Sequence, residues 1–194
     1  MDQQDTPLIV AIGGTQRLHS SSASALRFCL AVAERLNVRT RLFCGSDILL
    51  PVYDPADPER SPEASALVAA LREADGVILA SPGYHGGVSG LVKNAIDYIE
   101  DMSRDDQPYL SGRAVGCIAA AAGWQAGGAV LSGLRASVHA LRGWPTPLGV
   151  QLNTAEPLFD AEGGCLNDAA AGQLVELTRQ IIEFADMRRR RAAA

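Results

Sequence analysis

The stretch Leu8-Ile9-Val10-Ala11-Ile12, followed directly by Gly13-Gly14, decides the fold class of this chain. A short, continuous apolar run predicts a β-strand that is buried on both faces, as in a parallel sheet. From Ser22 to Leu36, apolar residues recur at helical spacing behind serines that can cap a helix. A buried strand, a glycine turn and a helix form the first part of a crossover between parallel strands.

The alternation of strand and helix patterns continues along the rest of the chain. Further strands are predicted at 40–44, 76–81, 113–120 and 146–150. Helices are predicted at 62–72, 89–102 and 127–141, and from a cap at Asn167 onward. A connection with four prolines at 51–62 cannot be a regular element. Repeated crossovers predict a parallel sheet covered on both faces, so we expect one α/β domain over residues 1–194.

Composition and charge restrict the class of protein. The 194 residues suit one domain, and 47% hydrophobic with 20% charged residues is a globular balance. A net charge of −5 argues against binding to nucleic acid or an anionic membrane, and Arg188–Arg191 is expected to be a solvated tail. The polar start and the lack of an apolar run of about 20 residues predict a cytoplasmic protein. The cysteines show no metal-ligand spacing, so no metal is expected.

The segment after the first strand, Gly13–Ser22, combines glycines, hydroxyls and one arginine ahead of a helix. Free N–H groups and the helix dipole favour an anion there, and Arg17 adds a charge-assisted contact. We interpret this segment as a phosphate site, against the alternative of a serine-rich turn that only caps the helix. It is neither a GxGxxG fingerprint nor a P-loop with its lysine.

The segment after the third strand is also unusual. Pro82–Gly87 is expected to be a sharp turn with little side-chain bulk, which suits the edge of a flat heteroaromatic ring. Tyr84 is either part of that site or a half-buried aromatic plug. His85 is either a proton donor or a surface histidine with ordinary hydrogen bonds.

Here the sequence resembles a known family. Pro-x-Tyr-x-Gly at 82–86, followed by Gly-x-x-Lys-Asn-Ala-Ile-Asp at 90–97, is similar to the signature of NAD(P)H-dependent FMN reductases and their azo- and quinone-reducing relatives. The resemblance extends from about Leu8 to about Val150. It implies a flavodoxin-like three-layer sandwich with a five-stranded parallel sheet, FMN as cofactor, and NADPH or NADH as co-substrate. It also implies a homodimer or homotetramer.

The resemblance assigns roles to three sets of residues. Those that would hold the FMN phosphate are Thr15, Arg17, Ser20, Ser21 and Ser22. Those that would line the isoalloxazine ring are Pro82, Gly83, Tyr84, His85 and Gly86. Those that would lie near the ring or the ribityl chain are Gly123, Trp124 and Gln125. Many relatives carry asparagine in place of His85, and a core tryptophan is the alternative for Trp124. Because the flavin performs the hydride transfer, no catalytic side chain is expected.

Three functions follow from these observations. The first is an FMN reductase that supplies reduced flavin to a partner monooxygenase. The second is a reductase with bound FMN that acts on quinones, azo dyes or metal oxyanions. The third is a flavodoxin-type electron carrier. One fold and one cofactor site can serve all of them. The carrier fits least, because its Thr-Gly-Thr-type loop is absent here and the chain is only mildly acidic.

Overall fold

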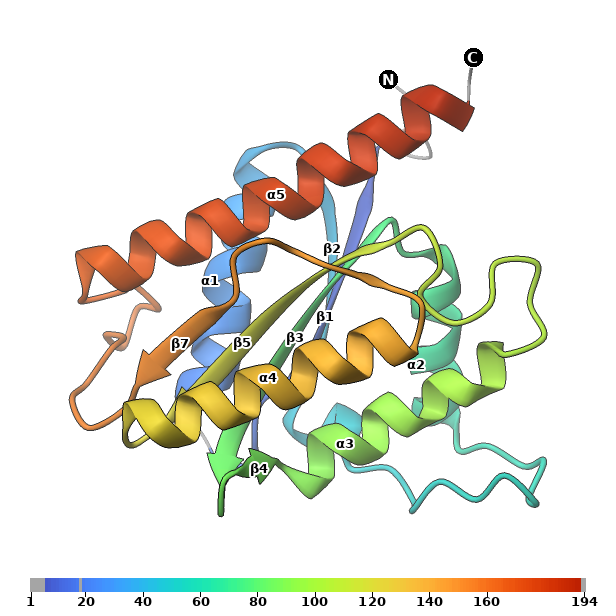
Figure 1. The fold of residues 1–194 in the computed structure, drawn as a ribbon, viewed down its shortest axis with the longest axis horizontal. Helices are drawn as coiled ribbons and strands as arrows, with labels where there is room; N and C mark the ends of the chain where they lie inside the picture. The colour runs from blue at the N-terminus through green and yellow to red at the C-terminus, as the bar shows by residue number, and fades with distance from the viewer. Residues whose placement is uncertain (1–5, 18, 193–194) are drawn as a thin grey trace.

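The computed structural model describes residues 6–17 and 19–192. Its strands are β1 (Leu8–Gly13), β2 (Arg39–Cys44), β3 (Gly76–Tyr84), β4 (Gly87–Val88), β5 (Ala114–Ala121), β6 (Trp144–Pro145) and β7 (Val150–Asn153). They form one sheet in the order β2-β1-β3-β5, with β6 and β7 both pairing with β5 (Figure 1). All pairs are parallel except the β3–β4 hairpin. This is the doubly wound, flavodoxin-like order, as predicted.

The predicted helices are all present, although the one predicted at 89–102 is α-helical only to Asp97 and continues as a 3₁₀ turn. They are α1 (Ser21–Arg35), α2 (Pro62–Glu73), α3 (Gly90–Asp97), α4 (Trp124–Ala140) and α5 (Asp168–Ala192), with 3₁₀ turns η2 (Gly45–Ile48) and η3 (Tyr98–Met102). The predicted caps are confirmed: Ser61 accepts a hydrogen bond from the Ala64 N–H, and Asn167 accepts one from Ala170. Among the described residues, none of these helices has the length and apolar character required to cross a bilayer.

The sheet is buried because its two faces pack against different helices. Along β1, Val10 and Ile12 belong to a core shared with α2, α3 and α4, whereas Ile9 and Ala11 belong to a core shared with α1 and α5. This follows from the two-residue period of a strand, which sends successive side chains to opposite faces. Figure 1 shows the resulting layers, with α3 and α4 on one side of the sheet and α5 on the other.

The predicted fifth strand at 146–150 is wrong in its bounds. The chain pairs with β5 at β6, leaves it, and returns at β7. Between the two strands, Thr146 donates its hydroxyl to the Leu148 carbonyl at 2.7 Å, and its own carbonyl accepts from Arg135 Nη1 at 2.6 Å. The Thr146 N–H still donates to the Val115 carbonyl of β5 at 3.0 Å, but the Thr146 carbonyl bonds to Arg135 of α4, and pairing with β5 resumes only at β7.

The arginine run at the end of α5 is not simply a solvated tail. Arg189 Nη1 lies 3.1 Å from Asp75 Oδ2, and the same carboxylate oxygen accepts from the Leu8 N–H at 2.9 Å. The helix continues through this run to Ala192. The end of α5 is therefore tied to the start of β1 and to the residue before β3.

The proline-rich connection predicted at 51–62 has no regular element as far as residue 61, where α2 follows, and it is held by side chains. Arg60 donates from Nε and Nη2 to the two carboxylate oxygens of Asp101, at 2.7 and 2.9 Å. The Tyr53 hydroxyl donates to the same carboxylate at 3.1 Å, and the Tyr53 N–H donates to Asn94 Oδ1 at 2.9 Å. Asp101 thus anchors this connection to η3.

The pKa of Asp101 is lowered, first by the Arg60 hydrogen bonds and against the opposing effect of burial. A carboxyl whose pKa is lower in the folded state stabilises the fold above its unfolded pKa, here 3.8. That contribution is lost as the pH falls through the lowered folded pKa. We therefore expect Asp101→Asn to be less stable than wild type by about 1–3 kcal/mol at neutral pH.

The difference between Asp101→Asn and wild type should shrink as the pH falls below 3.8, measured by urea unfolding at several pH values. The matched control is Asp106→Asn, because Asp106 is exposed on the neighbouring segment. If the free energy of unfolding depended on pH equally in the wild type and in Asp101→Asn, the assigned role of this carboxylate would be contradicted.

Candidate functional site

The site is built around the point where β1 ends against β3. The Gly14 N–H donates to the Ala80 carbonyl at 3.2 Å. Gly13 has a φ of 147°, and a Cβ there would lie 1.9 Å from the same carbonyl oxygen. Only glycine permits this close approach. Because β2 lies on one side of β1 and β3 on the other, the chain leaves the sheet here at a topological switch point, where ligands of such folds bind.

The segment between β1 and α1 is organised by its own hydroxyls. Thr15 Oγ1 accepts from the Arg17 N–H at 3.0 Å, and the buried Ser20 and Ser22 hydroxyls lie 2.9 Å apart. Ser20 is the N-cap of α1 and accepts from the Ala23 N–H at 3.5 Å. The first turn of α1 carries no acidic residue. The remaining N–H groups at the helix start and the exposed Arg17 can therefore serve an anion.

The predicted sharp turn at Pro82–Gly87 is wrong in extent, because β3 continues to Tyr84 and only two residues turn. The Ala80 carbonyl accepts a hydrogen bond from the first loop, on the side of β3 where β1 lies. The backbone of Pro82, two residues later, faces that same side, but β1 has already ended there. A proline without an N–H can stand there because no acceptor needs it. His85 and Gly86 have φ of 51° and 79°, as a two-residue hairpin turn requires.

Helix α4 also begins earlier than predicted, at Trp124 rather than Gly127. Gly123 is its N-cap, and the Gly123 carbonyl accepts from the Gly127 N–H at 3.2 Å. A Cβ at Gly127 would lie 3.3 Å from Gln151 Oε1, so this glycine lets α4 pack against β7. Trp124 and Gln125 therefore lie in the first helical turn and not in a loop. The Trp124 side chain is 64% exposed, which excludes the alternative of a core tryptophan.

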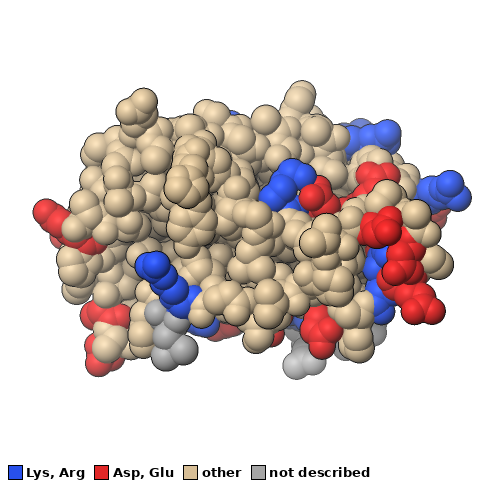
Figure 2. All heavy atoms as spheres, turned by 90° about the horizontal axis from the view of Figure 1, so that it is seen from below, with Lys and Arg blue, Asp and Glu red and all other residues tan. Residues whose placement is uncertain are grey.

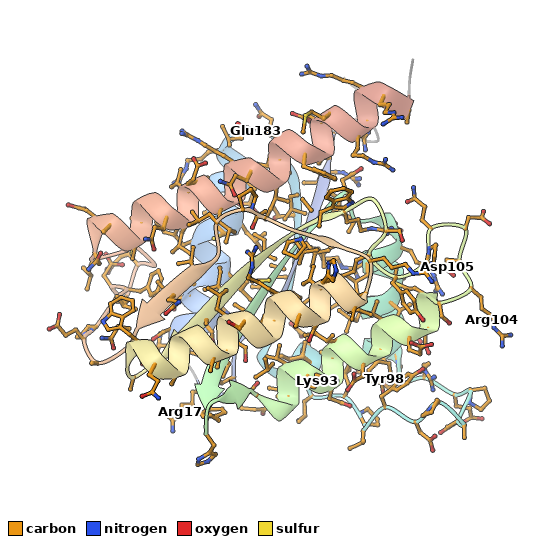
Figure 3. The ribbon with its side chains drawn as sticks, in the orientation of Figure 1. Arg17, Lys93, Tyr98, Arg104, Asp105 and Glu183 are labelled. Carbon is orange, nitrogen blue, oxygen red and sulfur yellow. The ribbon has the colours of Figure 1, made fainter. Side chains whose placement is uncertain are left out.

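These elements enclose a groove of about 520 Å³, within the range of small-molecule sites. The predicted residues that line it are Thr15, Arg17, Ser20, Ser21, Ser22, Pro82, Gly83 and Tyr84. Lining residues that sequence reasoning missed are His19, Ala120, Ala121, Ala122 and Thr154. The predicted residues outside its lining are His85, Gly86, Gly123, Trp124 and Gln125. Figure 3 shows Arg17 near the carboxyl end of β3.

The lining of the groove combines two chemically different groups of residues. One group is Arg17 with the hydroxyls of the first loop, and no carboxylate is present among the described lining residues. The other is Gly83 and the alanines of 120–122, which have little side-chain bulk, together with Tyr84, which is 49% exposed. A phosphate fits the first group and the edge of a flat ring fits the second. The residues present therefore fit a flavin mononucleotide.

The thiols do not offer a nucleophile to this groove. Burial raises the pKa of Cys29 and of Cys117 to about 12. Cys44, close to the first loop, has Arg27 Nη2 at 3.4 Å, yet burial still raises its pKa. All three thiols are therefore protonated at neutral pH.

Comparison with known proteins decides the family. Residues 7–156 match the model of the NADPH-dependent FMN reductase family. The chain belongs to the NADPH-dependent FMN reductase family. The match includes both loops and all the strands of the sheet, and it ends just after the segment that contributes Thr154. The resemblance first seen at 82–97 is thereby confirmed.

Individual members of this family are similar to only part of this chain. An NADPH azoreductase of a Bacillus species is 33% identical over 46% of this chain and 47% of its own length. An NAD(P)H-dependent FMN reductase of Pseudomonas aeruginosa is 30% identical over 59% of this chain and 60% of its own. Both alignments thus span less than two thirds of the relative. A solved NADH:FMN oxidoreductase has a TM-score of 0.70 at 23% identity, covering 92% of this chain and 89% of that protein, which shows the shared fold.

Proposed function

We propose that this chain is an NAD(P)H-dependent FMN reductase, which binds FMN in the groove between the first loop and the end of β3. The observation that carries the proposal is the meeting of an anion site and a flat, small-residue wall in one groove. Family membership supports it independently. Bound FMN would supply the hydride acceptor for NADH or NADPH.

The first loop would hold the phosphate. Arg17 would provide the positive charge, and Thr15, Ser20, Ser21 and Ser22 would provide hydroxyls and N–H groups. The buried pair Ser20–Ser22 orients its hydroxyls before a ligand arrives, which reduces the ordering that binding requires.

The end of β3 would hold the ring. Ser81 is fully buried, and its hydroxyl accepts from the Ser89 N–H at 3.0 Å, so the two ends of the hairpin are fixed to each other. Gly83 lies against Ala121 and Val130, where a Cβ would be 2.9 and 3.2 Å away. This packing would hold the backbone of β3 rigidly beside a bound ring, and the partly exposed Tyr84 would limit the access of water to it.

We further propose that residues 1–194 form one FMN-binding domain and that the protein is a cytoplasmic homodimer or homotetramer. A hollow of about 330 Å³ lies between η3, α3 and α4, and its lining combines apolar side chains such as Ile96 and Leu141 with the charged Lys93, Asp97 and Glu100. Figure 2 shows the molecule from below with most charged side chains gathered toward its ends. Apolar side chains bordered by charged ones suit contact with a second copy of the chain.

The deciding experiment is anaerobic mixing of the purified protein with FMN and with NADH or NADPH, while the flavin absorbance is followed. Rapid bleaching would establish the reductase. Binding of FMN without bleaching would support an electron carrier instead, and absence of FMN binding would overturn the site. After bleaching, retention of FMN on desalting separates a reductase with bound FMN from one that releases reduced flavin to a monooxygenase.

A further inference from the structure

A second groove, of about 460 Å³, adjoins the first. Thr154 lines the first groove, and its two chain neighbours, Asn153 and Ala155, line the second. Trp124 lines the second groove and follows the 120–122 wall of the first by two residues. A ligand in the second groove can therefore reach a flavin bound in the first.

An aromatic platform lies in this second groove. Trp124 is 64% exposed at the start of α4. Among the described residues no aromatic ring packs on its indole, whereas Trp144 packs on Phe184 with 5.8 Å between ring centroids. Stacking on a planar base would bury this indole surface.

Carboxamides surround the platform: Gln151, Asn153, Asn167 and Gln173. Two of them use only their oxygen, since Asn153 accepts from the Ala155 N–H at 3.1 Å and Asn167 accepts from Ala170 at 2.9 Å. Their NH₂ groups have no acceptor among the described residues. Neutral donors and acceptors of this kind match the polar edge of a nucleobase.

The charge in the second groove favours a ligand with free hydroxyl groups over one with a phosphate. Glu156 is the only charged side chain among its described lining residues, and it is exposed. A carboxylate suits the 2′- and 3′-hydroxyls of a ribose, to which it can accept hydrogen bonds. The same carboxylate repels a 2′-phosphate, and the lining offers no lysine or arginine to compensate.

We propose that this groove binds the adenosine half of the nicotinamide cofactor and that it makes the protein prefer NADH over NADPH. Adenine stacks on Trp124, its edge meets the carboxamides, and the ribose hydroxyls meet Glu156. The proposal rests on the proposed function for the identity of the co-substrate. It assigns the choice between the two cofactors to one residue, Glu156.

The test is isothermal titration calorimetry with two probes, ADP-ribose and its 2′-phosphorylated form, on the wild type and three variants. ADP-ribose should bind the wild type at least about tenfold more tightly than the phosphorylated probe. Trp124→Ala should weaken ADP-ribose binding by about 5- to 150-fold, the usual loss of one base–aromatic stack. Glu156→Arg should reverse the order of the two probes.

The matched control is Glu183→Arg, the same charge change at an exposed site on α5 (Figure 3), which should leave the order of the probes as in the wild type. Equal affinity of the wild type for both probes, or an unchanged order in Glu156→Arg, would overturn the proposal. FMN bleaching is measured separately. Bleaching with equal KM for NADH and NADPH contradicts this inference alone, whereas no bleaching with either contradicts the proposed function.

Discussion

Replacing Arg17 with alanine is expected to weaken FMN binding by about 10- to 150-fold, the value of one charge-assisted hydrogen bond to a phosphate. Arg17 is the only lysine or arginine among the described residues that line the first groove, and none of those lining residues is a carboxylate. The side chain is exposed, so its removal creates no cavity and should leave the fold intact. The measurement is a titration of the apoprotein with FMN, followed by quenching of the flavin fluorescence.

Two controls test whether the loss of affinity is specific to Arg17 and to the phosphate group. Arg179→Ala removes an exposed arginine of α5 that does not line the groove, and it should leave FMN affinity unchanged. Riboflavin, which lacks the phosphate, should bind wild type and Arg17→Ala with similar affinity. An Arg17→Ala protein that retains full FMN affinity would refute the placement of the phosphate at the first loop.

Replacing Gly13 with alanine is expected to lower the free energy of unfolding by about 2–6 kcal/mol, from overpacking and backbone strain of about 1–3 kcal/mol each. The added Cβ would stand 1.9 Å from the Ala80 carbonyl oxygen, at a φ of 147°. To accept it, β1 and β3 must separate at the switch point. FMN affinity should fall as well, because the first loop starts from this residue.

Urea unfolding of both the variant and a matched glycine substitution measures the effect. Gly172→Ala is that control, since a Cβ at Gly172 in α5 meets nothing within 4 Å. It should be neutral or stabilise the protein by up to about 1 kcal/mol. A Gly13→Ala protein within about 0.5 kcal/mol of wild type would show that the two strands separate at little cost.

Parts of the fold were predictable wherever local signals agreed with the tertiary structure. The run from Leu8 to Ile12 is apolar at every position, and only a strand covered on both faces buries all of it. Ser61 with Pro62, and Asn167, are helix-start signals that work through their nearest neighbours. The split of the last strand into β6 and β7 was not predictable, because it depends on Arg135 of a different element.

The candidate site also has residues that local sequence signals predicted and residues that they did not. Thr15, Arg17 and the serines of 20–22 were identified from their place after a buried strand, and the structure gathers them in one groove. Thr154 carried no signal, since it follows a strand whose bounds were misplaced by several residues. Trp124 was interpreted as a loop residue because the glycines at 127 and 128 suggest a late helix start, yet those glycines allow α4 to pack on Gln151.

The class of fold and the family could be inferred from the amino-acid sequence alone, and a phosphate loop could be predicted from it, because each inference depends on residues adjacent in the chain. Only the tertiary structure showed which segments share a groove and that a second groove lies beside the first. It also placed Glu156 as the one charged side chain among the described residues that line that groove. These properties depend on distances between β7, α4 and α5, which form no local pattern, since packing of side chains far apart in the sequence determines them.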